Sequence, residues 1–322
     1  MPELNPGRTF EIPRSGRLNV SREFFEVLEF SSLPCFLLCP LRPCGNAVYC
    51  PPNRTFPPSE GFSEITLRFC ALASGSKGNC IYVESNGTRI LVDAGLSRAQ
   101  IVRRLSEIGV RPETLSAVVI THEHTDHVRG APVLSRTYHV PVYVNEGTRR
   151  SWDLFKRTYR NCAFETGTPF AVGGLRLEPF SVPHDAADPV GLVISNGEKR
   201  IGIASDLGIA TGLVRERLRG TDALIVESNH DPVMLEEGPY PWELKQRISG
   251  TQGHLSNDDC GMLVQELLHG GLRHVVLAHL SEVNNQPDVA RRCVQAYLED
   301  AGALDLNLSV ACQDLVGPLF EL

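Results

Sequence analysis

The segment from Thr121 to His127 constrains this chain more than any other part of its sequence. It reads Thr-His-Glu-His-Thr-Asp-His and directly follows the apolar stretch Leu115–Ile120, which predicts a buried strand. Imidazoles and carboxylates are ligands that zinc and manganese accept. In a loop leaving a strand, His122 and His124 would point to one side. Asp126 and His127 would turn toward a neighbouring point, which suits two ions about 3.5–4 Å apart. The segment therefore predicts a dinuclear metal centre at a strand end.

Three later residues, each placed after a strand-like stretch, have the chemistry to complete this centre: His184, Asp206 and His279. Considered alone, each has a structural alternative of equal weight. His184 could be a loop histidine with satisfied hydrogen bonds, and Asp206 could be a helix N-cap. Strand ends of a sheet converge on one rim, so their shared placement favours the metal-ligand interpretation. Asp206 would then bridge both ions through its two oxygens.

From Glu64 onward the chain alternates strand-like and helix-like stretches, which predicts a layered α/β body with two sheets between helices. Asn86-Gly87 is the strongest turn signal and predicts a hairpin of Cys80–Glu84 with Arg89–Asp93. Other strands are expected at Ile65–Leu72, Leu115–Ile120, Arg200–Ala204, Ala223–Val226, His274–Ala278 and around Leu308–Ala311. Helices are expected after the capping residue Ser97, over Asn257–Leu268 and over Pro287–Asp300.

Size and composition fit one globular domain. The chain has 322 residues, of which 42% are hydrophobic and 21% charged, as in ordinary globular proteins. No apolar run reaches the roughly 18 residues of a membrane span, and the N-terminus carries no export signal. The ten cysteines are therefore expected to be reduced, in a cytoplasmic protein. The net charge of −7 argues against indiscriminate nucleic-acid binding, although bound cations would reverse the sign locally.

Residues 1–64 differ from the rest. They are rich in proline and show no sustained hydrophobic period, which predicts an irregular or disordered extension. Four cysteines lie there, at positions 35, 39, 44 and 50. A metal knuckle is the alternative, but no histidine pair accompanies them. We therefore expect residues 65–322 to form the functional domain.

The histidine-rich segment, with His184, Asp206 and His279 downstream, resembles the metallo-β-lactamase superfamily. Five further segments resemble its YycJ/WalJ branch and occur in the same order: Ala73–Asn79, Ser205–Gly208, Glu227–Asp231, Gly253–Asn257 and Ala278–Ser281. The similarity covers about residues 65–302. It implies an αββα four-layer sandwich and a metal-dependent exonuclease that degrades single-stranded DNA from its 5′ end.

The resemblance also implies residue roles. His122, His124 and His184 would hold one metal ion, Asp126, His127 and His279 the other, with Asp206 between them. Glu227 and His254 match an acidic residue and a histidine that meet the scissile phosphate in nucleases of the superfamily. About 47 residues separate Asp206 from His254, too few for the inserted cap of the RNA-processing relatives.

The implied mechanism uses a water activated by two Zn²⁺ or Mn²⁺ ions. Asp126 would be both a ligand and the group that orients this water. His254 would act as phosphate contact or general acid, and Glu227 would fix its ring. The alternative for His254 is helix capping near Ser256.

Residues 149–160 contain Arg149 and Arg150 among further basic and aromatic side chains. This composition has two equal interpretations. One is a basic groove whose aromatic rings stack on the bases of single-stranded DNA. The other is a solvated helix face with buried aromatic side chains. The loop Ser74–Asn79 has two interpretations. It presents backbone N–H groups to a terminal phosphate, or it is a tight turn that passes beneath the metals. In the first case Ser76 and Asn79, together with Asn229 elsewhere in the chain, would contact the substrate.

Two rival functions remain, because this fold hosts many chemistries. A glyoxalase-II-like thioesterase would need neither the Glu227–His254 pair nor the basic aromatic stretch. A non-catalytic metal-binding scaffold would have lost at least one ligand, whereas all seven positions are filled here.

Overall fold

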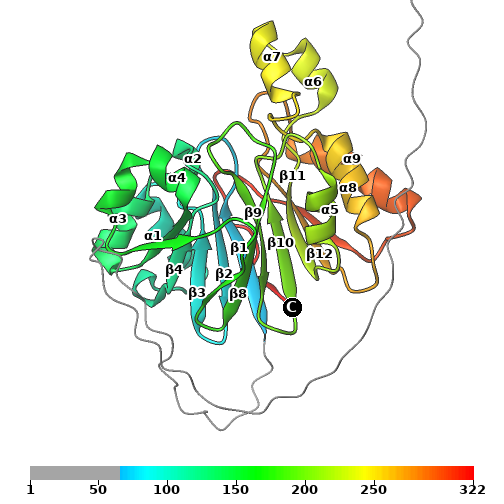
Figure 1. Ribbon diagram of the computed structural model, residues 1–322. Coiled ribbons are helices and arrows are strands. Elements are labelled where there is room, and N and C mark those ends of the chain that lie inside the picture. Colours follow the sequence, from blue (N-terminus) through cyan, green and yellow to red (C-terminus); the bar gives the residue numbers. More distant parts are fainter. Residues whose placement is uncertain (1–65) are drawn as a thin grey trace, which may run out of the picture. The chain divides into compact units, whose positions relative to one another are not determined.

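The computed structural model of the protein describes residues 66–322 (Figure 1). The extension predicted at residues 1–64 and its four cysteines lie outside these residues. Two seven-stranded sheets pack face to face, and helices cover their outer faces. Among the described helices, none has the length and apolar character that a membrane crossing requires.

The first sheet begins antiparallel and ends parallel. Strands β14, β1, β2 and β3 pair antiparallel, and β3 to β6 pair parallel. In sheet order the strands are β14 (Phe320–Glu321), β1 (Leu67–Ala73), β2 (Cys80–Ser85), β3 (Thr88–Val92), β4 (Ala117–Val119), β5 (Val142–Asn145) and β6 (Asn161–Phe164). The predicted hairpin is confirmed. Asn86 and Gly87 both have positive φ, of 49° and 75°, the twist that a two-residue hairpin turn needs.

The second sheet has the same mixed organisation. Strands β10 to β13 pair parallel, and β7, β8, β9 and β10 pair antiparallel. In sheet order the strands are β13 (Asn307–Val310), β12 (His274–Ala278), β11 (Ala223–Glu227), β10 (Arg200–Ala204), β9 (Val190–Ser195), β8 (Leu175–Ser181) and β7 (Phe170–Val172).

The helices lie between and beyond these strands. They are α1 (Arg98–Glu107), η1 (Pro112–Thr114), α2 (Thr125–Val128), α3 (Ala131–Tyr138), α4 (Glu146–Ser151), η2 (Asp153–Arg157), α5 (Gly212–Leu218), α6 (Pro232–Glu237), α7 (Trp242–Ile248), α8 (Asn257–Glu266) and α9 (Pro287–Asp300). Ser97 caps α1 with a reciprocal capping box to Gln100, as its position predicted.

Three apolar layers hold the domain together, and strand alternation assigns residues to them. In β2, Ile81 and Val83 enter the core between the sheets, whereas Tyr82 faces the helices. In β11, Ile225 enters the core between the sheets and Leu224 faces the helices on the other side. Because both faces of these strands are covered, their sequences are almost continuously apolar. The four-layer α/β sandwich predicted from the sequence is confirmed.

Candidate metal centre

The candidate site lies at the rim where strands of both sheets end. The histidine-rich segment follows β4, Asp206 follows β10, and His279 follows β12. Asp206 and His279 have left-handed backbone, with φ of 54° at each. Non-glycine residues in this conformation cost energy and are concentrated at functional sites. The strands thus bring together side chains from distant parts of the chain, as the sequence predicted.

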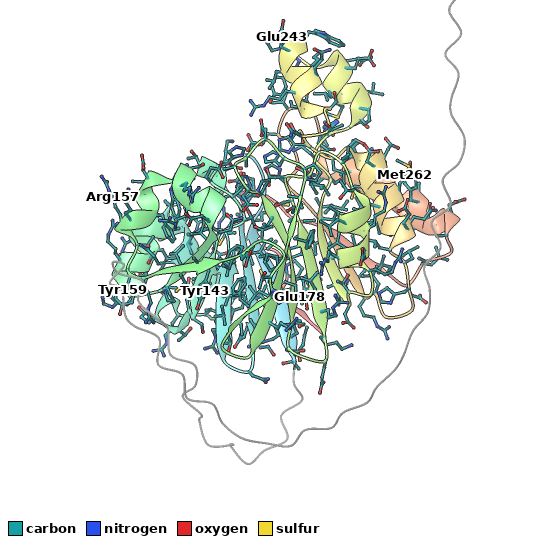
Figure 2. The ribbon with its side chains drawn as sticks, viewed as in Figure 1. Tyr143, Arg157, Tyr159, Glu178, Glu243 and Met262 are labelled. Atoms are coloured by element: carbon teal, nitrogen blue, oxygen red, sulfur yellow. The ribbon has the colours of Figure 1, made fainter. Side chains whose placement is uncertain are left out.

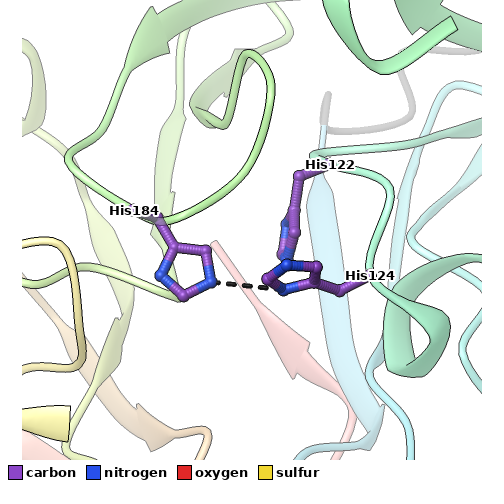
Figure 3. A group of neighbouring side chains, drawn as sticks. All are labelled: His122, His124 and His184. Carbon is purple, nitrogen blue, oxygen red and sulfur yellow. Dashed lines mark hydrogen bonds between the residues drawn. The ribbon is translucent and has the colours of Figure 1, made fainter. Parts of the chain in front are cut away.

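The first group of possible metal ligands contains His122, His124 and His184 (Figure 3). One nitrogen from each ring lies within 4.8 Å of the others. His184 Nε2 lies 3.3 Å from His124 Nδ1. Two nitrogens bound at about 2.0–2.1 Å to one tetrahedral ion lie about 3.3 Å apart. The spacing therefore suits two ligands of one cation.

The second group contains Asp126, His127 and His279. Asp126 Oδ2 lies 3.3 Å from His127 Nε2 and 3.5 Å from His279 Nε2. Asp206 lies between the groups: its Oδ2 is 3.1 Å from His127 Nε2, and its Oδ1 is 3.7 Å from His184 Nε2. A carboxylate with one oxygen toward each group is placed to bridge two cations.

Hydrogen bonds to Nδ1 fix the orientation of three imidazoles. His127 Nδ1 lies 2.8 Å from Asp93 Oδ2, His279 Nδ1 lies 2.7 Å from Glu227 Oε1, and His184 Nδ1 lies 3.1 Å from the Gly253 carbonyl oxygen. When Nδ1 donates its proton to such an acceptor, Nε2 presents its lone pair on the opposite side of the ring. The rings are thus oriented for metal binding through Nε2.

Buried polar atoms without partners indicate that the site fits metal ions. His122 and His279 are 2% and 4% exposed, and their Nε2 atoms have no hydrogen-bond partner among the described residues. Burial lowers the pKa of His122 well below its usual value, so its imidazole is neutral and can donate a lone pair. Leaving such atoms unpaired is costly, and a cation in each of the two ligand groups would satisfy one of them.

Glu227 connects the ligand groups to His254. Its Oε1 accepts from His279 Nδ1 and, at 2.8 Å, from His254 Nδ1. Its Oε2 accepts from the backbone N–H groups of Leu207 and Leu255, at 2.6 and 3.2 Å. Burial by itself would raise the pKa of this carboxyl, but the two imidazoles outweigh it and lower the pKa to about 2. Glu227 is therefore an anion, and it positions the residues beside it.

The helix-cap alternatives for Asp206 and His254 do not hold. The N-cap of α5 is Thr211, and that of α8 is Ser256. His184, the third residue with a structural alternative, contacts both His124 and Asp206 and is not an isolated loop histidine.

The loop Ser74–Asn79 lies against the ligands. Asn79 Nδ2 donates to Asp126 Oδ2 at 3.1 Å, and Ser74 Oγ accepts from the His279 backbone N–H at 2.7 Å. Asn79 is buried and does not line the pocket, whereas Ser76 and Asn229 do line it. Of the two alternatives for this loop, the structure favours the turn that braces the ligands, with Ser76 at the pocket wall.

The basic aromatic stretch lies elsewhere. Arg149 and Arg150 pair with Glu146 on α4 and do not line the pocket. Trp152 and Phe155 are buried in the core beneath the first sheet's helices, so neither can stack on a base. Figure 2 shows Arg157 and Tyr159 on the flank beside α3, away from the rim. The buried-aromatic alternative is therefore the correct one for Trp152 and Phe155.

Sequence reasoning missed three residues near the site: Asp93, Tyr240 and Arg247. Asp93 follows strand β3 just as Asp206 follows β10, and it also has a positive φ, of 63°; the strand-end criterion would have found it. Tyr240 and Arg247 line the pocket from the α6–α7 segment, which carries no motif that could have identified them.

The four-layer sandwich, with imidazoles and carboxylates gathered at one rim, defines the metallo-β-lactamase fold. The metallo-β-lactamase fold protein YhfI from Bacillus subtilis superposes with a TM-score of 0.62 at 16% identity, over 80% of this chain and 100% of that one. A model of the β-lactamase superfamily domain matches residues 88–280, and the chain belongs to this superfamily.

Two curated relatives are similar over most of their length. Exodeoxyribonuclease YycJ from Bacillus anthracis is 36% identical over 242 residues, which cover 73% of this chain and 90% of the relative. Exodeoxyribonuclease WalJ from Streptococcus pneumoniae is 35% identical over 268 residues, which cover 81% and 100%. The resemblance to the YycJ/WalJ branch is confirmed.

Proposed function

We propose that this protein is a metal-dependent exodeoxyribonuclease that removes nucleotides from the 5′ end of single-stranded DNA. Its active site belongs to residues 65–322, the metallo-β-lactamase domain. The observation that carries the proposal is the double role of Glu227, which binds both the ligand His279 and the pocket-lining His254. Similarity to the two exodeoxyribonucleases over 90–100% of their length supports it.

Seven residues would hold two divalent cations, Zn²⁺ or Mn²⁺: His122, His124, Asp126, His127, His184, Asp206 and His279. Such a pair supplies an activated water near neutral pH and neutralises charge on the phosphate. Burial alone would raise the pKa of Asp126, but the imidazoles of His127 and His279 beside it hold the pKa well below its usual range. Asp126 is therefore ionised and can accept a hydrogen bond from the attacking water.

His254 would protonate the leaving oxygen. Burial by itself would lower the pKa of its imidazole, but Glu227 raises it above the usual value. The raised pKa favours the imidazolium form, in which Nε2 would carry the proton to be transferred while Nδ1 donates to Glu227. A general acid needs a proton held within reach of the leaving group at the working pH, and His254 lines the pocket beside the ligands.

The proposal also covers the setting of the enzyme. The six described cysteines are free thiols, which supports a reducing compartment, the cytoplasm. Ser76 and Asn229 line the pocket and are proposed as contacts to the DNA end. Arg149 and Arg150 are not, because they pair with Glu146 on the flank.

The test is degradation of single-stranded DNA labelled at its 5′ or 3′ end, with Mn²⁺ or Zn²⁺ added. We expect release of the 5′ label as mononucleotides, weaker cutting of RNA, and a loss of at least 100-fold in kcat for Asp126→Ala, because removing one preorganised group costs about that much. Turnover of a thioester or a lactam with DNA left intact would overturn the proposal.

A further inference from the structure

Helices α6 and α7 stand at the rim, beyond the ends of the strands (Figure 1). Among their residues only Leu235 is buried, and α7 has no buried residue. Glu243, at the outer end of the pair, faces solvent (Figure 2). Helices this short owe their stability to tertiary packing rather than to intrinsic propensity, yet this pair contributes little to the core. Its placement at the pocket suggests a role there. We call α6, α7 and the turn between them the rim helices.

One face of α7 forms a wall of the metal pocket. Leu244, Arg247 and Ile248 line it, and their spacing of three and four residues places them on one helix face. Tyr240, in the turn before α7, lines the same pocket. Trp242 and Lys245 lie on the same segment but do not line it.

Charge makes Arg247 unusual in this wall. The pocket is lined by Asp126, Asp185 and Asp206, and Arg247 is the only lysine or arginine among the described residues that line it. Its Nε donates to Asp185 Oδ2 at 2.7 Å, and Nη2 contacts the same oxygen. Asp185 directly follows the candidate ligand His184, so this ion pair holds the guanidinium next to the metal centre.

Arg247 keeps donors for a second partner. A guanidinium has five N–H donors in a planar fork, and the two contacts to Asp185 leave both N–H groups of Nη1 free of any partner among the described residues. The side chain is 65% exposed. A phosphate can therefore bind Nη1 while Asp185 keeps the arm in place.

We propose that the rim helices hold the unpaired DNA strand next to the scissile phosphate. Arg247 binds the phosphate that follows the scissile one, and Tyr240 stacks on an adjoining base. Single-strand sites combine backbone cations with aromatic platforms in this way. The inference rests on the proposed function and adds the residues that position the strand. Residues 149–160 cannot have this role, because Arg149 and Arg150 do not line the pocket.

The test compares Arg247→Ala with Lys245→Gln, which removes the same charge from the same helix outside the pocket and keeps a donor for the Glu236 carbonyl oxygen that Lys245 Nζ contacts. Kinetics are measured on single-stranded DNA and on bis(p-nitrophenyl) phosphate, a diester without a following phosphate or base. For Arg247→Ala we expect kcat/KM for DNA, divided by kcat/KM for bis(p-nitrophenyl) phosphate, to fall about tenfold. Most of this change should come from a higher KM for DNA. The slope of log KM against log salt should fall by about 0.7, the value for one single-strand phosphate contact. Lys245→Gln should leave both the kcat/KM ratio and the salt slope unchanged.

Tyr240→Ala is compared with Trp242→Ala, because Trp242 is an aromatic residue of the same segment that is 66% exposed and does not line the pocket. Loss of one stacked base predicts a rise of about tenfold in KM for DNA with no change in the salt slope. If the wild type cleaves DNA but both pocket variants match their controls, the strand-holding role is wrong and the proposed function stands. If the wild type cleaves no DNA, both fail.

Discussion

At the scale of single residues, Asp93 and Glu227 hold the imidazoles of two proposed ligands without being proposed as ligands themselves. Each is an almost fully buried carboxylate that accepts from the imidazole of a proposed ligand, His127 or His279. Such outer carboxylates fix the tautomer of the ring and raise its basicity. We therefore expect metal affinity to depend on these carboxylates as well as on the proposed ligands.

Asp93→Asn tests this at one position. Asparagine tolerates the left-handed backbone that Asp93 adopts, so the change removes a charge without straining the chain. We expect metal affinity to fall about 10- to 100-fold, measured by competition with a chromophoric chelator. Asp222→Asn is the control, because Asp222 is a half-buried carboxylate that accepts from Lys199 Nζ and from the Arg200 backbone N–H outside the site. Equal affinities in both variants would contradict the assignment.

At the scale of elements, two loops brace the histidine-rich segment: the loop after β3 and the loop Ser74–Asn79. The Ala94 N–H donates to the His127 carbonyl oxygen at 2.7 Å, and the Asn79 N–H donates to the Asp126 carbonyl oxygen at the same distance. Gly95 packs directly against this backbone. A Cβ at Gly95 would lie 1.5 Å from the backbone carbonyl oxygen of Asp126. Only glycine allows these backbones to approach so closely.

Gly95→Ala should therefore be severe. The added methyl meets backbone rather than a movable side chain, so we expect a loss of about 3 kcal/mol or more in the free energy of unfolding together with weaker metal binding. Urea denaturation measures the first. Gly212→Ala is the control, because nothing lies within 4 Å of the added Cβ and the change should stay within about 0.5 kcal/mol. Similar stabilities for the two variants would show that the bracing is unimportant.

The elements with a clear local signal were predictable from sequence, whereas β5, β6, β7, β9, β14 and the helices α2 to α7 were not predicted. Capping at Ser97, the Asn86-Gly87 turn and the apolar run of β12 each act within a few residues. The wall formed by Tyr240 and Arg247 was not predictable, because α7 buries no side chain and so lacks the apolar period that would mark its orientation. Likewise, Trp152 and Phe155 could be assigned to the core only once their three-dimensional neighbours were known.

At the scale of the whole molecule, the centre joins the two sheets. His122, His124, Asp126 and His127 follow a strand of the first sheet, whereas Asp206 and His279 follow strands of the second. Cations bound to this set would link both halves of the sandwich, so metal binding and global stability should be coupled.

Removing metal should therefore lower the melting temperature. A ligand at about 1,000 times its Kd stabilises the folded state by about 4 kcal/mol, which for a domain of this size corresponds to roughly 10 °C. Thermal denaturation with chelator and with added Zn²⁺ or Mn²⁺ measures the shift. His184→Ala should reduce this shift in melting temperature. If the melting temperature of the wild type is the same with and without metal, metal binding and stability are not coupled.

The order of the ligands along the chain has a consequence for how this protein is made. His279 and the strand before it are translated after every other proposed ligand, and β14, at residues 320 and 321, closes the first sheet by pairing with β1. A ribosome that stalls before codon 279 releases a polypeptide without a complete centre. We expect such truncated products to be inert, so that hydrolytic activity would arise only after the second sheet has been synthesised as far as β12 and His279.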